Sequence, residues 1–194
     1  MTNTEVIKTY EDTHSLLKGH FRLSSGRHSD RYLQSALVLQ YPWVAEKLCQ
    51  ALAEIVKPLN VEAVVSPALG GVIVGQELAR ALRVKAMFTE RNKENDAMEL
   101  RRGFRVEKGD RIFAVEDIIT TGKSVKESIE VVRGLGAEVV GVGCLIDRSG
   151  GADGIFDVPL KALATLKVES WEEKDCPLCK QGSPVTKPGS RAKF

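Results

Sequence analysis

The chain has 194 residues, of which 43% are hydrophobic, and its 28 basic and 26 acidic side chains leave a net charge of +2. This length suits one domain with a substantial core, and the near-balance of charge argues against a dedicated nucleic-acid-binding protein. Because no apolar run reaches the ~20 residues of a membrane span and the N-terminus does not resemble a signal peptide, we expect a cytoplasmic enzyme with no membrane partner.

The N-terminal part of the chain predicts a helix followed by two strands. Residues 4–18 carry apolar side chains at helical spacing, which predicts an amphipathic helix. Residues 19–40 alternate in polarity and favour two strands joined by a turn at Ser24 to Gly26. Pro42 then opens a further helix.

Strand-like and helix-like segments alternate from residue 61 onward. The expected strands are 61–65, 84–89, 112–115, 139–146 and 160–168, and the expected helices are 72–82 and 124–135. This alternation predicts an α/β fold with a parallel sheet and right-handed crossovers. Ligands bind beyond the C-terminal strand ends of such sheets, so the loops after three of these strands should converge on one rim.

The most informative segment is 111–124. An apolar run ends in Glu116 and Asp117, and a polar loop then leads into a helix. Free N–H groups at the start of that helix favour an anion, and ionised carboxylates accept hydrogen bonds from sugar hydroxyls. The pattern therefore indicates a site for a phosphorylated sugar.

Two other interpretations compete with this one. Gly122, Lys123 and Ser124 match the end of a nucleotide-binding P-loop, but the full pattern needs glycine where Asp117 stands. The other interpretation is a plain strand, turn and helix with solvated acids. Two charges directly after a buried strand need a partner or water, which makes this structural interpretation the weaker one.

Residues 115–124 resemble the phosphoribosyl-diphosphate binding motif of type I phosphoribosyltransferases. The resemblance implies that family's fold, a central and mostly parallel sheet flanked by helices, with a small hood built from the N-terminal and C-terminal parts. It implies one domain over residues 1–170, with the hood at about 19–40 and a mobile lid at about 91–109. Residues 171–194 form a tail that we expect to be extended and weakly ordered, apart from any part that Cys176 and Cys179 fix.

The same resemblance implies how the donor, phosphoribosyl diphosphate, is bound. The residues that it assigns to the donor are Arg91, Glu116, Asp117, Ile118, Ile119, Thr120, Thr121, Gly122, Lys123, Ser124, Ala68, Leu69 and Gly70. The last three belong to the pyrophosphate loop, whose glycines permit close backbone approach, although a simple tight turn is an alternative. Mg²⁺ is expected as cofactor, held mainly by diphosphate and water rather than by protein ligands.

The acceptor is implied by two further segments. Residues 21–29 resemble the hood of orotate phosphoribosyltransferases, and residues 145–148 resemble the strand end whose arginine meets the orotate carboxylate. The implied orotate-binding residues are Thr120, Arg148, Tyr32 and Leu33. The implied reaction is phosphoribosyl transfer to orotate in pyrimidine biosynthesis, a pentosyltransferase activity. The alternatives are a purine-base phosphoribosyltransferase and a regulator that binds phosphoribosyl diphosphate without turnover.

The chain departs from the family pattern in the hood and the lid. Ser24 stands where many members carry lysine, and the lid contains no histidine. We expect Lys93 to be the catalytic cation beside Glu116 and Asp117, with Arg101 or Arg102 behind it, and solvated surface charge is the alternative for each. In the family the lid reaches the neighbouring subunit, which implies a homodimer.

Cys176 and Cys179 form a Cys-Pro-Leu-Cys pair in the tail. They supply half of the four ligands that a structural zinc site needs, and His14, His20 and His28 are distant in sequence. We therefore expect a redox or metal-free structural pair, with zinc shared between subunits as the alternative.

Overall fold

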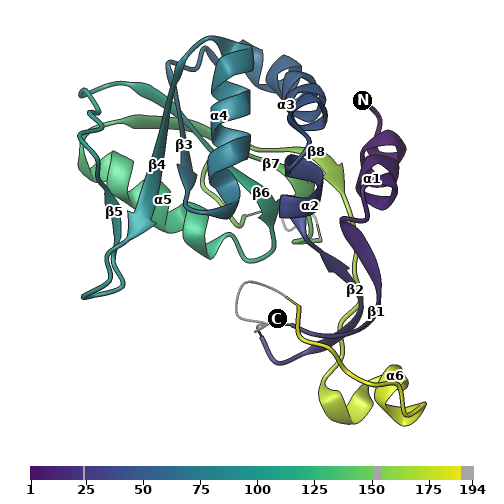
Figure 1. Cartoon of the computed structure of the whole chain (residues 1–194). Helices are drawn as coiled ribbons and strands as arrows, with labels where there is room; N and C mark the ends of the chain where they lie inside the picture. Colours follow the sequence, from purple (N-terminus) through teal and green to yellow (C-terminus); the bar gives the residue numbers. More distant parts are fainter. Residues whose placement is uncertain (24, 151–153, 189–194) are drawn as a thin grey trace.

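The computed structural model describes residues 1–23, 25–150 and 154–188. Its main body is a six-stranded sheet (Figure 1). In spatial order the strands are β5 (Met98–Leu100), β4 (Lys85–Arg91), β3 (Ala63–Pro67), β6 (Arg111–Ile119), β7 (Glu138–Asp147) and β8 (Leu160–Thr165). Every neighbouring pair is parallel except β4 and β5. The predicted α/β fold with a mostly parallel sheet is confirmed.

Helices cover both faces of this sheet (Figure 1). On one face lie α3 (Pro42–Val56) and α4 (Gly70–Leu82), and on the other lies α5 (Lys123–Gly134). Successive residues of β6 alternate between the two cores, since Phe113 packs with the α3 and α4 side and Ala114 with the α5 side. Because helices cover both faces of the sheet, its central strands are apolar on both sides, as is usual in parallel sheets.

The remaining elements lie at the ends of the chain and in short connections. They are α1 (Asn3–Asp12), β1 (Leu16–Arg22), β2 (His28–Leu33), α2 (Ser35–Leu39), η1 (Lys57–Leu59), η2 (Glu173–Asp175) and α6 (Pro177–Lys180). Strands β1 and β2 form the predicted antiparallel hairpin, which projects away from the main sheet (Figure 1). Ser24, the hood position that departs from the family pattern, lies outside the described residues.

The C-terminal segment is ordered against this hairpin, so the expected weakly ordered tail is wrong for residues 171–188. The N–H of Arg22 donates to the carbonyl of Thr186 at 2.8 Å, and the N–H of His28 donates to the carbonyl of Trp171 at 2.8 Å. A two-stranded hairpin leaves backbone donors and acceptors unpaired on its edges, and the tail satisfies several of them. The end of the tail, residues 189–194, lies outside the described residues.

Two boundaries differ from the sequence-based prediction. The first helix ends at Asp12 rather than near residue 18, because the chain turns at His14 (φ 54°) and Leu16 then pairs with Leu33. Strand β6 continues four residues beyond the predicted end at Val115, since its pairing with β7 extends to Ile119. The short α2 and β5 were not predicted. No helix within the described residues has both the length and the apolar character of a membrane span.

Candidate active site

Glu116 and Asp117 lie inside β6 near its C-terminal end, rather than in the loop after it. Because strand side chains alternate between faces, they point to opposite sides of the sheet. Asp117 faces the start of α4, where a methyl group added at Gly70 would lie 3.0 Å from its Oδ1. The pyrophosphate loop and the acidic strand therefore meet directly at Gly70, where a larger side chain would crowd the carboxylate.

Both carboxyl groups lie where ionisation is unfavourable. Burial raises the pKa of Glu116 to about 8, and the neighbouring Asp117 adds to this shift. Burial also raises the pKa of Asp117, although the nearby Ser35 hydroxyl and the backbone N–H of Ile118 partly offset it. Ligands that bring donors or positive charge to these acids would stabilise their ionised forms.

The loop after β6 leads into the N-terminus of α5, where the N–H of Lys123 donates to the Thr121 hydroxyl at 3.4 Å. Gly122 adopts a left-handed conformation (φ 69°), and α5 begins at Lys123 with no side-chain cap among the described residues. Thr120 and Thr121 are exposed, and the Lys123 side chain points outward with 75% of its surface accessible. The uncapped N–H groups and the dipole of α5 form a suitable site for a phosphate.

The pyrophosphate loop follows β3 at the same end of the sheet. The N–H of Ala68 donates to the carbonyl of Thr89 at 2.7 Å, which ties this loop to β4. The peptide bond between Ala68 and Leu69 is cis, and Leu69 is 87% exposed. The three residues assigned to diphosphate binding thus lie between the acids of β6 and the end of β4.

Arg148 follows β7 and lies beside the acidic strand, because its N–H donates to the carbonyl of Ile119 at 2.8 Å. Burial lowers the pKa of its guanidinium, and Tyr32 opposes this effect from the hood. Its Nε is buried and has no hydrogen-bond partner among the described residues. The hood thus brings Tyr32 close to Arg148, whereas Leu33 is 5% exposed and belongs to the core.

The predicted lid begins with the β4–β5 hairpin, at the edge of the sheet farthest from β8 (Figure 1). Arg91 is ion-paired with Glu127 of α5 and also donates to the carbonyl of Asp96 at 2.8 Å. Lys93 is exposed in the loop that joins β4 to β5. Since β3 separates β4 from β6, the structure places Lys93 apart from Glu116 and Asp117 in the sheet.

Two further arginines of the lid lie beside carboxylates of β4 and β5. Arg102 donates to Glu90 at 2.9 Å and 3.1 Å, and Arg101 lies 3.9 Å from both Glu90 and Glu99. Arg101 is 52% exposed and Arg102 is 63% exposed, so these surface ion pairs contribute little to stability. The lid also carries three exposed cations with no ion pair among the described residues, which are Lys93, Arg105 and Lys108.

Residues 41–164 match the family described as the phosphoribosyl transferase domain. The orotate phosphoribosyltransferase of Caldicellulosiruptor saccharolyticus is 50% identical to this chain over 191 residues, which cover 98% of each sequence. The chain belongs to the orotate phosphoribosyltransferase family. The family member from Desulforamulus reducens is 51% identical over 98% of each chain, and that from Thermotoga maritima is 49% identical over 93% of this chain and 95% of its own.

Two solved structures share the fold of this chain. Orotate phosphoribosyltransferase from Aeropyrum pernix superposes with a TM-score of 0.73 at 28% identity, covering 83% of this chain and 93% of that one. Adenine phosphoribosyltransferase from Thermoanaerobacter pseudethanolicus has a TM-score of 0.60 at 19% identity, covering 70% of this chain and 88% of that one. The second likeness concerns the fold alone.

Sequence reasoning missed three neighbours of the site. Glu127 neutralises Arg91, and Tyr10 and Ser35 lie near Asp117. The hydroxyls of Tyr10 and Ser35 are buried without a hydrogen-bond partner among the described residues. The sequence could not predict that Arg91 pairs with Glu127, because α5 and β4 come together only when the helix packs on the sheet.

Proposed function

We propose that this chain transfers phosphoribose from 5-phosphoribosyl 1-diphosphate to orotate, giving orotidine 5′-phosphate and diphosphate in pyrimidine (UMP) biosynthesis. The observation that carries this proposal is the partly buried guanidinium of Arg148, whose Nε is unpaired among the described residues, beside the acidic end of β6. A guanidinium binds a carboxylate through two parallel hydrogen bonds, and orotate carries a carboxylate. The names of the family members over nearly the whole chain support the same acceptor.

The donor would be held from three directions. The N-terminus of α5 would bind the 5′-phosphate through N–H groups of residues 121–124, and Glu116 and Asp117 would accept hydrogen bonds from the ribose hydroxyls. The loop at Ala68, Leu69 and Gly70 would hold the diphosphate. Arg91 would leave its ion pair with Glu127 and bind the diphosphate instead.

The reaction needs no protein nucleophile. The orotate ring nitrogen would form the new bond to the anomeric carbon as the bond from that carbon to the diphosphate oxygen breaks. The carboxylates of Glu116 and Asp117 would stabilise positive charge that develops on the ribose. Hard oxygen donors beside a diphosphate loop fit Mg²⁺, which would neutralise the departing diphosphate and would be held mainly by the substrate and water.

We also propose a homodimer in which the lid serves the neighbouring subunit. Lys93 lies beyond β4 at one edge of the sheet, whereas the acids lie on β6. Trp43 is 68% exposed, and Tyr41 packs beside it at a ring distance of 5.6 Å, so an aromatic surface is available for a partner. We propose the catalytic domain as residues 1–170.

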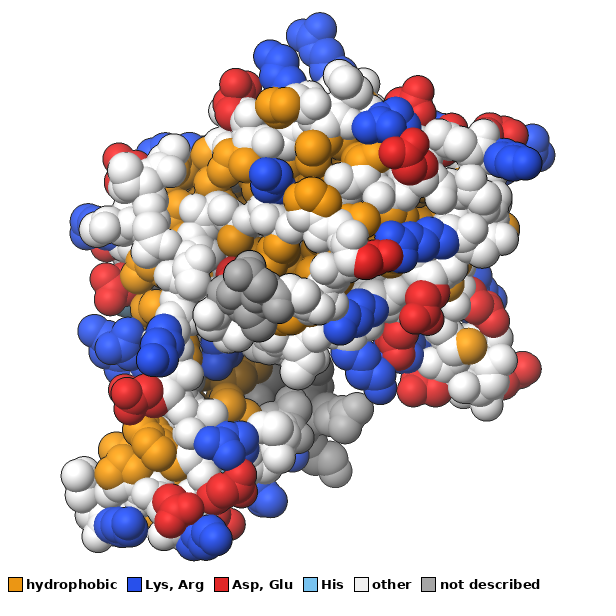
Figure 2. Space-filling view, turned by 180° about the vertical axis from the view of Figure 1, so that it is seen from behind, with side chains coloured by type: hydrophobic (Ala, Val, Ile, Leu, Met, Phe, Trp, Pro, Cys, Tyr) orange, Lys and Arg blue, Asp and Glu red, His pale blue; other side chains and the backbone are white. Residues whose placement is uncertain are grey.

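The cytoplasm is the compartment that we propose, in keeping with four cysteines that form no disulfide. A regulator that uses a nucleic-acid surface fits the chain less well. Basic and acidic side chains are interspersed over the face shown in Figure 2 and do not form a surface of one sign. The formal charge of +2 agrees with this pattern.

One assay separates the candidate functions. The purified protein with Mg²⁺ and phosphoribosyl diphosphate would be offered orotate, uracil, adenine, hypoxanthine and guanine in turn, and diphosphate release would be measured. We expect turnover with orotate alone. Turnover of a purine without orotate consumption would contradict the proposal, and binding of the donor without turnover of any base would identify a regulator.

A further inference from the structure

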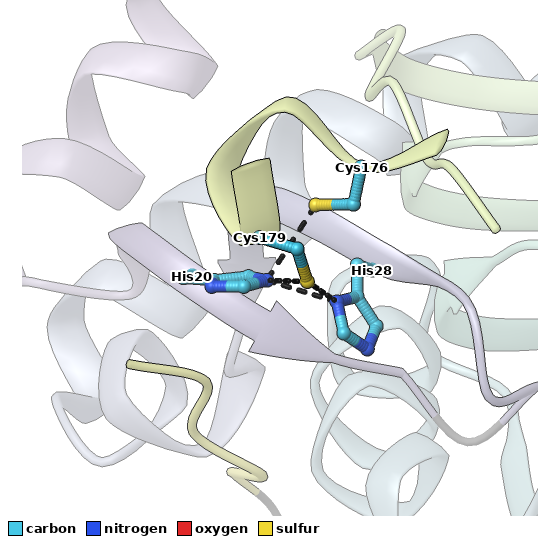
Figure 3. Close-up of side chains that lie close together, drawn as sticks. All are labelled: His20, His28, Cys176 and Cys179. Atoms are coloured by element: carbon cyan, nitrogen blue, oxygen red, sulfur yellow. Dashed lines mark hydrogen bonds between the residues drawn. The ribbon is translucent and has the colours of Figure 1, made fainter. Parts of the chain in front are cut away.

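Four potential metal ligands meet at the junction of the hairpin and the tail, away from the candidate active site. They are His20 on β1, His28 on β2, and Cys176 and Cys179 at the start and within α6 (Figure 3). We refer to these four residues as the hood cluster. The Nε2 of His20, the Nδ1 of His28 and both Sγ atoms lie within 4.8 Å of one another. The hairpin brings the two histidines together, and the tail that packs against it brings the two cysteines to them, although the residues are distant in sequence.

Two of the four short distances within the hood cluster match the edges of a tetrahedral zinc site, and the other two are shorter. Zinc–sulfur bonds of ~2.3 Å and zinc–nitrogen bonds of ~2.05 Å place ligand atoms roughly 3.3 to 3.8 Å apart. The Nε2 of His20 lies 3.5 Å from the Sγ of Cys176 and 3.7 Å from the Sγ of Cys179. The Nδ1 of His28 lies 3.2 Å from the Sγ of Cys179 and 2.9 Å from the Nε2 of His20. Small shifts would complete the tetrahedron.

The tautomer of His20 is set by the backbone. Its Nδ1 lies 2.8 Å from the carbonyl of Ser183, which can only accept a hydrogen bond, so Nδ1 carries the proton. The Nε2 then presents a lone pair toward the cluster, where one nitrogen and two sulfur atoms approach it. This lone pair can accept a hydrogen bond from only one of the three atoms at a time, whereas a single cation would satisfy all four ligand atoms. A histidine ligand that donates its other N–H to a carbonyl is the usual arrangement around a metal.

Burial supports the same conclusion. His20 is 4% exposed, His28 is 2% exposed and Cys176 is fully buried. Histidine is seldom buried to this extent without partners, and two of them side by side need a common one. Backbone hydrogen bonds fix the cluster on both sides, since Thr186 pairs with His20 and Trp171 pairs with His28.

We propose that the hood cluster binds one Zn²⁺ ion as a closed structural site. Two thiolates and two imidazoles in tetrahedral geometry are ligands typical of zinc. Four protein ligands leave no open position for a substrate, so the site is structural rather than catalytic. The ion joins the two strands of the hairpin to the tail within one chain, and no second subunit is needed.

The zinc site would stabilise the hood. A two-stranded hairpin alone is marginally stable, and here it projects from the main sheet. The ion adds a cross-link between residues 148 positions apart, His28 and Cys176, which supports the short backbone contacts of the tail. If the proposed function is right, the same cross-link holds Tyr32 of β2 near Arg148.

The test uses untagged full-length protein, prepared under reducing conditions with Zn²⁺ and then dialysed against metal-free buffer. Elemental analysis should give about one zinc per chain. Cys176→Ser/Cys179→Ser should lose the zinc, and His20→Gln should lose most of it. His14→Asn is the matched control, because His14 is the remaining histidine and lies outside the hood cluster; it should keep the metal.

Measurements on the unaltered protein keep the test independent of whether the variants fold. Removal of the ion with a chelator should lower the melting temperature by about 5 °C or more, and added Zn²⁺ should restore it. Co²⁺ in place of Zn²⁺ should give the visible absorption of a tetrahedral site with thiolate ligands. None of these readouts depends on catalysis, so a failed base assay would leave the zinc proposal intact.

Three results would overturn the proposal. One is unaltered protein that neither contains zinc nor takes it up. Another is a zinc content that stays the same in Cys176→Ser/Cys179→Ser, which would place the metal elsewhere. The third is a disulfide between Cys176 and Cys179 in protein isolated without oxidant, shown by mass spectrometry after alkylation.

Discussion

Asp117 is the residue on which the proposed donor site depends most, because its carboxylate lies against Gly70 of the diphosphate loop. Asp117→Asn keeps the shape and removes the charge, and we expect kcat/KM to fall by ~100-fold or more. Stability should hold or rise, because an ionised group in a buried position is costly. Enzyme kinetics test the expected loss of activity, and thermal melting tests the expected stability. Asp12→Asn, at the exposed end of α1, is the control, and equal activity in the two variants would remove Asp117 from the site.

The raised pKa of Glu116 should make the stability of the protein depend on pH. Its folded pKa of about 8 lies above the ordinary value of 4.5, so the folded protein binds this proton more tightly than the unfolded chain. The free energy of unfolding should therefore fall as the pH rises from about 4.5 to about 8, by at most about 1.4 kcal/mol per pH unit. Urea unfolding of Glu116→Gln should show this slope reduced, with the part that comes from the raised pKa of Asp117 remaining. Exposed Glu54→Gln is the control, and an unchanged slope in Glu116→Gln would show that the shift is absent.

Arg148 should act on the acceptor rather than on the donor. Arg148→Ala removes charge-assisted hydrogen bonds worth about 1.5–3 kcal/mol, so KM for orotate should rise roughly 10- to 100-fold. Arg148→Lys keeps the charge but loses the planar fork, and it should recover only part of the loss. Steady-state kinetics with each substrate varied in turn measures the effect. A change confined to phosphoribosyl diphosphate would contradict the assignment.

The start of α5 is the element whose backbone matters most for the proposed phosphate site. Gly122→Ala places a side chain at a φ of 69° and puts its Cβ 2.6 Å from the ring of Phe156. We expect a loss of about 1–3 kcal/mol in stability together with a higher KM for the donor. Gly134→Ala, at the other end of the helix where a Cβ meets nothing within 4 Å, should be neutral or stabilising. Urea unfolding compares the two, and equal effects would show that the conformation at Gly122 is unimportant.

Local pattern predicted the elements that make their contacts nearby in sequence. The strand, turn and helix over residues 111–124 follow from periodicity and glycine placement, and so does the β1–β2 hairpin, but the strand continues through the acid pair that the pattern placed after it. Periodicity alone could not end the first helix at Asp12, because Leu16 is removed from it by pairing with Leu33. The partners that were missed have the same origin. Glu127 meets Arg91, and His20 meets Cys176, only after distant segments have packed.

At the scale of the whole molecule, the sheet separates the two halves of the proposed site. The acids of β6 and the guanidinium of Arg148 lie in its central and β7 region, whereas Lys93 lies beyond β4. A dimer that brings one subunit's lid to the other subunit's acids would reunite them. A site shared between two subunits makes a prediction that differs from that of a site formed within one chain.

Lys93→Ala and Asp117→Asn should each be nearly inactive, yet a mixture should regain activity. If subunits exchange freely, half of the dimers are mixed, and each has one site with both native residues, so about one quarter of the wild-type activity should return. If the lid serves its own subunit, every site in a mixed dimer carries one defect and no activity returns. Co-expression followed by the orotate assay measures the recovery, with light scattering to establish the dimer. Lys8→Ala, an exposed lysine on α1, is the control for loss of charge, and full activity in Lys93→Ala alone would show that this lysine is solvated surface charge.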